Sequence, residues 1–276
     1  MTTRDVVARD LPYAIAGDRL RIVFQPQIDL RTDRIVALEG LSRWTHETLG
    51  PIPPSEFVAV AESIGAIHDL GRFSLAECCR YGRTWHDRGE DLAIAVNVSP
   101  LQLATDAFFD DLERQIAVTG MPARNLILEV TEAQKLIDPD ALATRLDIVR
   151  EWGITVSIDD FGTGHSTLER AATLHAGELK LDRSMVARED RRAIEAAVNA
   201  ARLSGMRVVA EGVETAGQLD LVREAGCDRA QGYFIARPAP PRVLEEWMAD
   251  RQRSSRSSTE CLDLYDERGA RWPSAK

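Results

Sequence analysis

The chain has 276 residues, enough for one large barrel or two ordinary domains, and 44% of them are hydrophobic and 28% charged, as in soluble globular proteins. Its formal net charge of −10 argues against DNA or another polyanion as a non-specific partner. No apolar run reaches membrane-spanning length, and the first residues lack a signal-peptide core. The four cysteines form no Cys-x-x-Cys pair, so we expect a reduced, cytoplasmic protein.

Segments with strand and helix patterns alternate along almost the whole chain. Taken in order, they are strands 20–25 and 35–41, helices 54–64 and 68–86, strand 92–98, helix 108–118, strand 126–130, helix 139–152, strand 154–158, a helical stretch after 166, strand 178–181, helix 192–203, strand 207–210, helix 218–225, strand 229–233 and helix 241–249. Repeated β-α units predict a parallel sheet. About eight strands favour a closed α/β barrel of the (β/α)8 TIM type over an open doubly wound sheet.

The first two predicted strands depart from this alternation, because only a short turn around residues 29–33 joins them. A hairpin of this kind makes the barrel a modified one, with one antiparallel strand near the N-terminus. No internal linker is evident, so we expect one domain over residues 10–250, with Pro12 favouring a helix start near Asp10. Residues 251–276 are rich in Ser and Arg at first and show no periodicity, which predicts a flexible C-terminal tail.

Polar residues follow the apolar runs of seven predicted strands. They are Glu39, Asn97, Glu129, Asp159 with Asp160, Lys180, Glu211 and Gln231. Barrel enzymes place their active sites at the carboxyl ends of the strands. Helix caps would instead favour Ser, Thr and Asn over Glu. Because the five histidines show no zinc-type spacing, this set predicts a metal site with oxygen ligands, suited to Mg²⁺ or Mn²⁺.

Asp159 and Asp160 are adjacent, end the strand 154–158 and precede a glycine-rich turn. The pair alone suits a helix cap as well as a metal site, but the other strand ends favour metal. Two bridged cations can activate water and stabilise the charge of a phosphodiester, with Asp159 as the natural bridge and Lys180 orienting or helping to deprotonate the water. Acyl transfer is disfavoured, because no Ser-His or Cys-His pair stands in a suggestive context. Glycoside hydrolysis would need only two carboxylates.

Short motifs in a fixed order resemble one known family. They are Gln25-Pro26-Gln27, Glu39-Gly40-Leu41 with Arg43-Trp44, Asn97-Val98-Ser99, Glu129-Val130-Thr131-Glu132, the DDFGTG run from Asp159, Lys180-Leu181-Asp182, Glu211-Gly212-Val213-Glu214, and Gln231-Gly232-Tyr233. From about Leu11 to Trp247, the chain resembles the EAL-domain cyclic di-GMP phosphodiesterases of bacteria. Each motif alone is weak, whereas the ordered set is highly specific.

The resemblance implies a role for each matching residue. It implies two divalent cations, Mg²⁺ or Mn²⁺, with Glu39, Asn97, Glu129 and Asp159 holding the first and Asp159 and Asp160 the second. Its implied catalytic residues are Lys180, Glu211 and Gln231. Residues expected to contact the dinucleotide are Gln25, Leu41, Arg43 and Pro238, and Glu132 and Glu214 are expected to support loops. The implied reaction opens one phosphodiester bond of cyclic di-GMP to give linear pGpG, and the implied assembly is a homodimer through the loop after Asp160.

Three positions depart from the family pattern without removing a ligand. Gly40 replaces the usual alanine, which would give the backbone beside Glu39 more freedom. His165 stands where an aromatic residue is usual, and Glu178 replaces a common Asp. A receptor that binds cyclic di-GMP without turnover remains the main alternative, disfavoured because every ligand is kept. A Mg²⁺-dependent lyase of the enolase type is a weaker alternative, because it would not need Asn97 and Gln231 in these settings.

Overall fold

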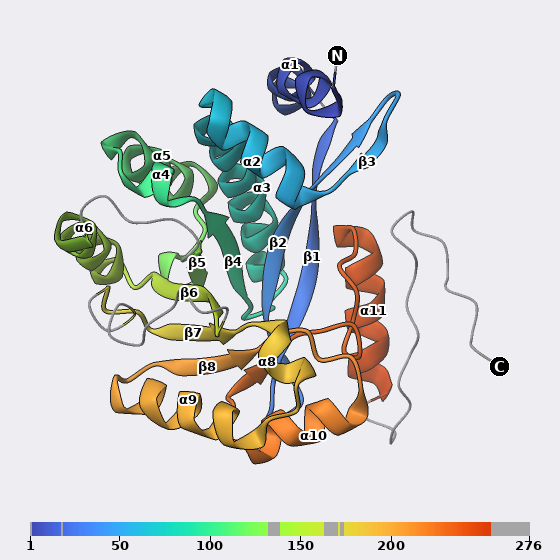
Figure 1. The fold of residues 1–276 in the computed structure, drawn as a ribbon, viewed down its shortest axis with the longest axis vertical. Coiled ribbons are helices and arrows are strands. Elements are labelled where there is room, and N and C mark those ends of the chain that lie inside the picture. The colour runs from blue at the N-terminus through green and yellow to red at the C-terminus, as the bar shows by residue number, and fades with distance from the viewer. Residues whose placement is uncertain (1, 18, 132–138, 163–170, 172–173, 255–276) are drawn as a thin grey trace.

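The computed structural model describes residues 2–17, 19–131, 139–162, 171 and 174–254. Their strands form a closed barrel with helices on its outside (Figure 1). The strands are β1 (Leu20–Asp29), β2 (Ile35–His46), β3 (Gly50–Ile52), β4 (Ala93–Val98), β5 (Leu126–Thr131), β6 (Thr155–Phe161), β7 (Glu178–Leu181), β8 (Arg207–Ala210) and β9 (Arg229–Ala230). The predicted α/β barrel is confirmed.

The barrel closes because β1 pairs with two strands far apart in the sheet order. That order is β1-β9-β8-β7-β6-β5-β4-β2-β3, and β1 also pairs with β2, so eight strands form the ring and β3 extends β2 outside it. β1 runs antiparallel to both β2 and β9, whereas the pairs from β2 through β4 to β9 are parallel. This confirms the single antiparallel strand that the hairpin start predicted.

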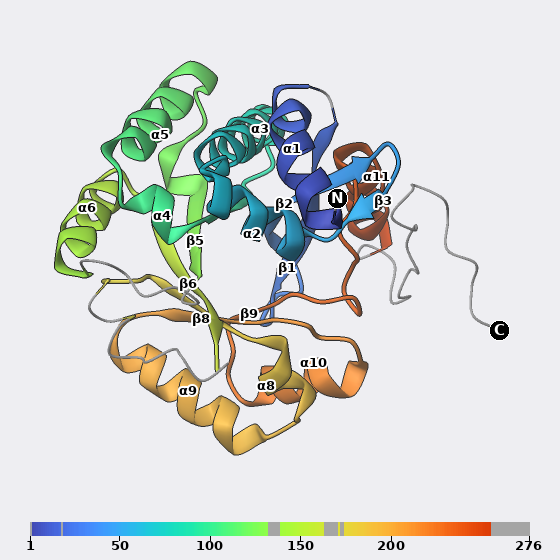
Figure 2. The same cartoon turned by 45° about the horizontal axis from the view of Figure 1, so that its top comes forward.

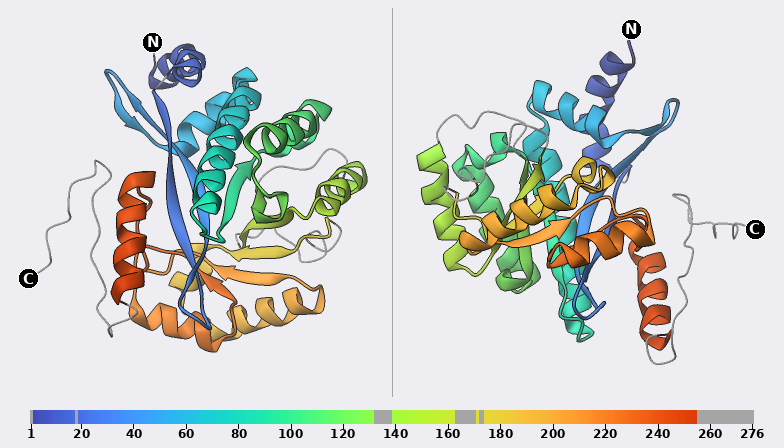
Figure 3. Two further views of the ribbon diagram at one scale, coloured as in Figure 1. Left: turned by 180° about the vertical axis from the view of Figure 1, so that it is seen from behind. Right: turned by 60° about the horizontal axis from the view of Figure 1, so that its bottom comes forward.

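Helices cover the outside of the ring (Figure 2). They are α2 (Pro54–Ile64), α3 (Ile67–Asp87), α4 (Pro100–Leu103), α5 (Asp106–Thr119), the 3₁₀ turn η1 (Ala123–Asn125), α6 (Pro139–Glu151), α8 (Arg183–Ala187), α9 (Arg191–Leu203), α10 (Ala216–Glu224) and α11 (Pro241–Ser254). α11 lies beside β1 and is joined to α3 by the Trp85 indole, which donates to Glu245 Oε1 at 2.9 Å (Figure 3). The last helix therefore belongs to the barrel wall.

The N-terminal helix α1 (Thr3–Ala16) begins earlier than the sequence predicted. Thr2 caps it through a reciprocal pair of hydrogen bonds with Asp5. The expected start near Asp10 was wrong because Pro12 is accommodated inside the helix, while Val7 and Leu11, one turn apart, are fully buried in a cluster that includes α2 side chains. At the other end α11 reaches Ser254, and residues 255–276 of the predicted tail lie outside the described residues.

The barrel interior has an apolar and ionic layer below its carboxyl-terminal end. Ala37, Ala95 and Ile127 form a small cluster of their own. Glu178, fully buried on β7, pairs through Oε2 with the guanidinium groups of Arg207 at 2.5 Å and Arg229 at 3.3 Å. This layer fixes the strands from which the polar side chains of the next layer project. Within the described part of the chain, no helix combines the length and apolar character needed to cross a membrane.

Candidate active site

Lys180 on β7 stands at the centre of the polar layer above. Its Nζ lies 2.7 Å from Glu211 Oε1, 2.9 Å from Glu129 Oε1, 3.3 Å from Asp159 Oδ1 and 3.7 Å from Glu39 Oε2. The lysine side chain is only 1% exposed. Side chains from separate strands therefore meet around one ammonium group, as alternation along each strand requires.

The surrounding charge decides the protonation of this lysine. Burial alone would lower the pKa of Lys180, but the facing carboxylates outweigh burial and raise that pKa well above its ordinary value. Lys180 is therefore a cation in this arrangement. The chain's lysines are Lys135, Lys180 and Lys276, and Lys180 is the one within the described residues. A compact ammonium can touch several carboxylates at once, which a planar guanidinium cannot do in the same space.

Hydrogen bonds fix the carboxylate of Glu39 from two sides. Asn97 Nδ2 donates to Glu39 Oε1 at 2.8 Å, and Gln231 Nε2 donates to Glu39 Oε2 at 2.5 Å. Gln231 Nε2 also reaches Gln25 Oε1 at 3.0 Å, and Gln25 Nε2 donates to the carbonyl of Ala236 at 3.0 Å. Burial raises the pKa of Glu39, but Lys180 and these donors leave that pKa below its ordinary value. The carboxylate of Glu39 is thus held in place as an anion.

The two adjacent aspartates turn to the same side of the barrel. Asp160 has a positive φ of 61°, and the β6–β7 register shifts between Ile158 and Phe161. Regular alternation would send the two side chains to opposite faces, so this irregularity changes their direction. Carboxylate oxygens of Asp159, Asp160 and Glu211 consequently lie within 4.8 Å of one another, close enough for one cation.

Glu129 provides the clearest fit to a cation. Its side chain is completely buried, and neither carboxylate oxygen has a hydrogen-bond partner among the described residues, although Oε1 touches Lys180 as an ion pair. Burial, with Glu39 next, raises the pKa of Glu129 well above its ordinary value. Burial likewise raises the pKa of Glu211 to about 8. Such carboxylates are costly unless a further positive charge joins them, so the donor set fits a hard divalent cation.

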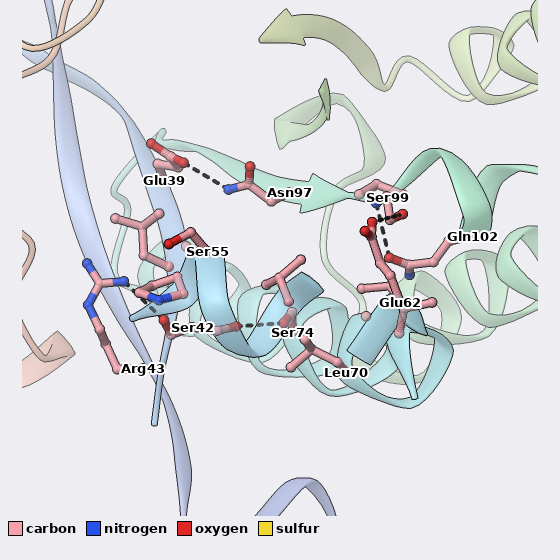
Figure 4. A pocket seen from close by; sticks show the side chains of 17 residues that line it. Glu39, Ser42, Arg43, Ser55, Glu62, Leu70, Ser74, Asn97, Ser99 and Gln102 are labelled. Carbon is pink, nitrogen blue, oxygen red and sulfur yellow. Dashed lines mark hydrogen bonds between the residues drawn. The ribbon is translucent and has the colours of Figure 1, made fainter. Parts of the chain in front are cut away.

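A cavity of about 280 Å³ opens beside these residues, between β2, α2, α3 and the β4–α4 connection (Figure 4). Glu39 and Asn97 form its wall on the side of the carboxylate cluster. Leu41 and Arg43, further along β2, also line it. The residues predicted from the sequence therefore line one cavity from two strands, β2 and β4. This cavity is continuous with the candidate metal centre.

Other cavity residues were missed by sequence reasoning. Ser99 and Gln102 line the far wall, where the Ser99 hydroxyl donates to Glu62 Oε1 at 2.8 Å (Figure 4). Gln102 Oε1 accepts the backbone N–H of Ser99 at 3.1 Å, forming a capping box at the start of α4. The Ser-x-x-Gln spacing is the signal that could have located this short helix.

The remaining predicted residues lie in different surroundings. Pro238 is half-buried and precedes Ala239, whose backbone pairs with Phe24 beside Gln25. Glu214 is exposed, and its backbone N–H donates to Gln218 Oε1 at 2.8 Å. Its supporting role stays a prediction. Glu132 and His165 lie outside the described residues, so the predictions that concern them stay predictions.

Comparison with known proteins agrees with this geometry. Residues 8–238 match the family model of the EAL domain. The cyclic di-GMP phosphodiesterase NbdA of Pseudomonas aeruginosa is 36% identical over 245 residues, covering 87% of this chain and 31% of NbdA. The oxygen sensor protein DosP of Escherichia coli is 34% identical over 252 residues, covering 89% of this chain and 32% of DosP. The chain thus spans about a third of these relatives' length.

Solved structures show the same fold with comparable identity. The PaMucR phosphodiesterase in complex with c-di-GMP is 36% identical, with a TM-score of 0.81 over 87% of this chain and 99% of that one. The EAL domain of Mycobacterium smegmatis DcpA is 31% identical, with a TM-score of 0.71 over 85% of this chain and 97% of that one. The chain belongs to the EAL domain family.

Proposed function

We propose that this chain hydrolyses one phosphodiester bond of cyclic di-GMP to linear pGpG with the help of two divalent cations, Mg²⁺ or Mn²⁺. The observation that carries the proposal is Glu129, whose carboxylate is fully buried beside those of Glu39, Asp159 and Glu211 and has Lys180, at 2.9 Å, as its cationic neighbour. This excess of buried negative charge is what divalent cations would neutralise. The relatives support the substrate, because NbdA is named a cyclic di-GMP phosphodiesterase and PaMucR was solved with that dinucleotide.

The acidic side chains divide between two cation positions in this proposal. Glu39, Asn97, Glu129 and Asp159 would hold one cation, and Asp159 and Asp160 would hold the other. Bound cations would polarise the phosphoryl oxygens and favour a hydroxide-like water. Lys180 supports this arrangement because its ammonium already touches carboxylates on both sides of the cluster.

Polar side chains of the chain then orient the reacting water and phosphate. Lys180 would orient the water, while Glu211, in contact with Nζ, fixes the direction of that group. Gln231 holds Glu39 and faces the same space. The water oxygen bonds to phosphorus, the bond from phosphorus to the ribose 3′ oxygen breaks, and the proton that the water loses is balanced by the one that the 3′ oxygen gains. The product has a 5′-phosphate and a 3′-hydroxyl group.

Substrate binding is assigned to the cavity and the barrel mouth. The cavity, with a volume of about 280 Å³, is large enough for part of a dinucleotide. One half of cyclic di-GMP would therefore occupy the cavity, and the other half would lie across the mouth of the barrel. Arg43 would bind a phosphate through its planar fork, and Leu41 would pack against the ligand. Gln25 and Pro238, which flank Phe24 and Ala239 of the bridge between β1 and the last loop, would complete the mouth.

A receptor that binds cyclic di-GMP without turnover is the competing proposal. Five carboxylates and Lys180 would not be needed to bind a dianionic ligand, since uncompensated acidic groups repel it. A complete acidic cluster is needed to hold cations for hydrolysis. The acidic cluster is therefore explained by hydrolysis and not by binding alone, which favours the hydrolase.

The experiment compares binding with turnover in the same protein. We expect calorimetry to show binding of cyclic di-GMP and chromatography to show pGpG when Mg²⁺ or Mn²⁺ is present. Glu39→Ala and Lys180→Ala should abolish product, whereas Glu246→Gln, an exposed acid on α11, should not. Tight binding without product under either metal would leave the receptor, and no binding would exclude both functions. Sedimentation of the same samples tests the proposed homodimer.

A further inference from the structure

We propose that Cys78, on α3, is a positioning residue for Glu39, because its thiol fills the space beside Gly40 and so fixes where β2 lies. Gly40 directly follows Glu39 and pairs with Phe24 on β1 and Val96 on β4. An effect on turnover rests on the proposed function, whereas an effect on packing and on metal binding does not.

Gly40 is required here by space. Its backbone does not have a positive φ, so the backbone conformation itself does not require glycine at this position. A Cβ added at residue 40 would lie 2.3 Å from Cys78 Sγ, far inside van der Waals contact. The next nearest described atoms, the Ala95 carbonyl oxygen and Ile22 Cγ2, would each be 3.5 Å away, which is an ordinary contact. The thiol alone therefore occupies the place of the missing methyl group.

The helix that carries Cys78 packs closely against its neighbours along one face. Gly71, Leu75, Cys78 and Gly82 recur at helical spacing and are all buried. A Cβ at Gly82 would approach Met121 Sδ to 2.7 Å, so α3 packs tightly at this position. Cys78 itself is fully buried in the main core. Because interiors are close-packed, the thiol cannot yield without moving its neighbours.

A second contact fixes the register of α3 on β2. The hydroxyl groups of Ser42 and Ser74 hydrogen-bond at 3.0 Å (Figure 4). Residues 40 and 42 lie on the same face of β2, and residues 74 and 78 are one turn apart on α3. The Gly40–Cys78 and Ser42–Ser74 contacts therefore form one seam. Movement of this seam shifts the backbone that carries Glu39, Leu41 and Arg43, all of which line the cavity.

A double-mutant cycle in Gly40 and Cys78 tests the seam. Gly40→Ala should lower Tm by about 5 °C through overpacking. It should also weaken Mn²⁺ binding by about tenfold, as loss of ligand support does. Cys78→Ala should also weaken Mn²⁺ binding, because β2 loses the thiol that it packs against. The double variant should bind Mn²⁺ more tightly than either single variant, because the methyl added at residue 40 fills the vacated space. Gly217→Ala is the matched control, because its added methyl would meet no described atom closer than 3.9 Å.

The outcomes separate this role of Cys78 from the proposed hydrolysis. A Gly40→Ala protein with wild-type Tm and Mn²⁺ affinity contradicts the proposal, as does a double variant no better than Gly40→Ala. If Gly40→Ala does not fold, a folded double variant supports the seam and an unfolded one contradicts it. If the wild type binds Mn²⁺ without turnover, the hydrolysis fails, while the cycle in Tm and Mn²⁺ affinity still decides the role of Cys78.

Discussion

The backbone N–H of Asp160 donates to the Oδ1 of Asp159 at 3.0 Å, across the point where β6 departs from regular alternation. The positive φ of Asp160 gives its carboxylate a place beside that of its neighbour. A left-handed backbone costs little for Asn or Asp and more for other residues with a Cβ. The geometry of the second proposed cation site therefore depends on one backbone angle.

Asp160→Asn should separate the backbone role of this residue from its charge. Asparagine tolerates the same φ, so Tm should stay within about 2 °C of wild type. Loss of one carboxylate should lower kcat by about 100-fold, since it removes an anionic ligand of the second cation. Chromatographic rates and thermal unfolding measure both. Asp33→Asn is the matched control, because Asp33 also has a positive φ, of 55°. If Asp160→Asn lowered Tm substantially as well as kcat, the backbone role and the charge of Asp160 would not be separable, which would contradict the prediction.

Lys180→Met should make the stability of the protein depend on metal. Without Nζ, the carboxylates of Glu129 and Glu211 lose a contact at 2.9 and 2.7 Å. Leaving buried charges unpaired costs about 3–5 kcal/mol. We expect a low Tm in EDTA and a larger rise on adding Mn²⁺ than in wild type, measured by calorimetry. The same Mn²⁺ response in both proteins would show that cations do not share the place of the ammonium group.

Glu129→Gln should maintain or raise the stability of the metal-free protein and should abolish tight metal binding. Burial and the neighbouring carboxylate of Glu39 disfavour the charge of Glu129 more than the contact with Lys180 favours it, so the amide should leave Tm in EDTA unchanged or raise it. The same change should abolish tight Mn²⁺ binding and product formation. Isothermal calorimetry and thermal unfolding in EDTA test the two halves. A large drop in Tm without metal would mean that Glu129 is a structural partner of Lys180 instead.

Glu178→Gln should destabilise the fold by about 3 kcal/mol, because it leaves Arg207 and Arg229 facing each other without their shared carboxylate. Urea unfolding measures the free-energy change. Glu246→Gln, which breaks an exposed pair with Arg242, is the control and should have little effect. If both variants changed the free energy of unfolding by the same amount, the Glu178–Arg207–Arg229 triad would not contribute to stability as predicted.

Arg43→Ala should raise KM for cyclic di-GMP by about 10- to 100-fold and leave kcat nearly unchanged, because a charged hydrogen bond to phosphate contributes about 1.5–3 kcal/mol. Initial rates over a range of substrate concentration separate the two constants. Arg191→Ala, which removes an exposed arginine paired with Glu195 and Glu224, is the control. A fall in kcat alone would place Arg43 at the reacting phosphate rather than in binding.

Much of the fold could be predicted from apolar periodicity. The bounds of α2, β7 and β8 agree with the predicted segments 54–64, 178–181 and 207–210. The agreement is close because residues that typically end helices or strands flank each of these segments. β2 was predicted to end at Leu41 but continues to His46, since polar residues in its outer half pair with β1 and β3. The start of α1 was wrong because Pro12 is a strong local signal that burial of Val7 and Leu11 overrides.

The candidate site could be predicted as a set of residues but not as a geometry. Strand ends gave Glu39, Glu129, Asp159 and Lys180, which the structure brings together. The sequence could not show that Lys180 is held protonated, since that follows from distances between strands. Neither could it show that Gly40 faces Cys78, because the two residues lie on different elements and meet only through packing.

The most direct test of the central claim is mass spectrometry of the product formed in H₂¹⁸O with Mn²⁺. If the carboxylate cluster directs water to a phosphodiester, cyclic di-GMP will become pGpG carrying one ¹⁸O in its terminal phosphate. The Lys180→Met protein should give no labelled product. If wild-type protein saturated with Mn²⁺ and cyclic di-GMP returned the dinucleotide unchanged and unlabelled, the proposed hydrolysis would be contradicted.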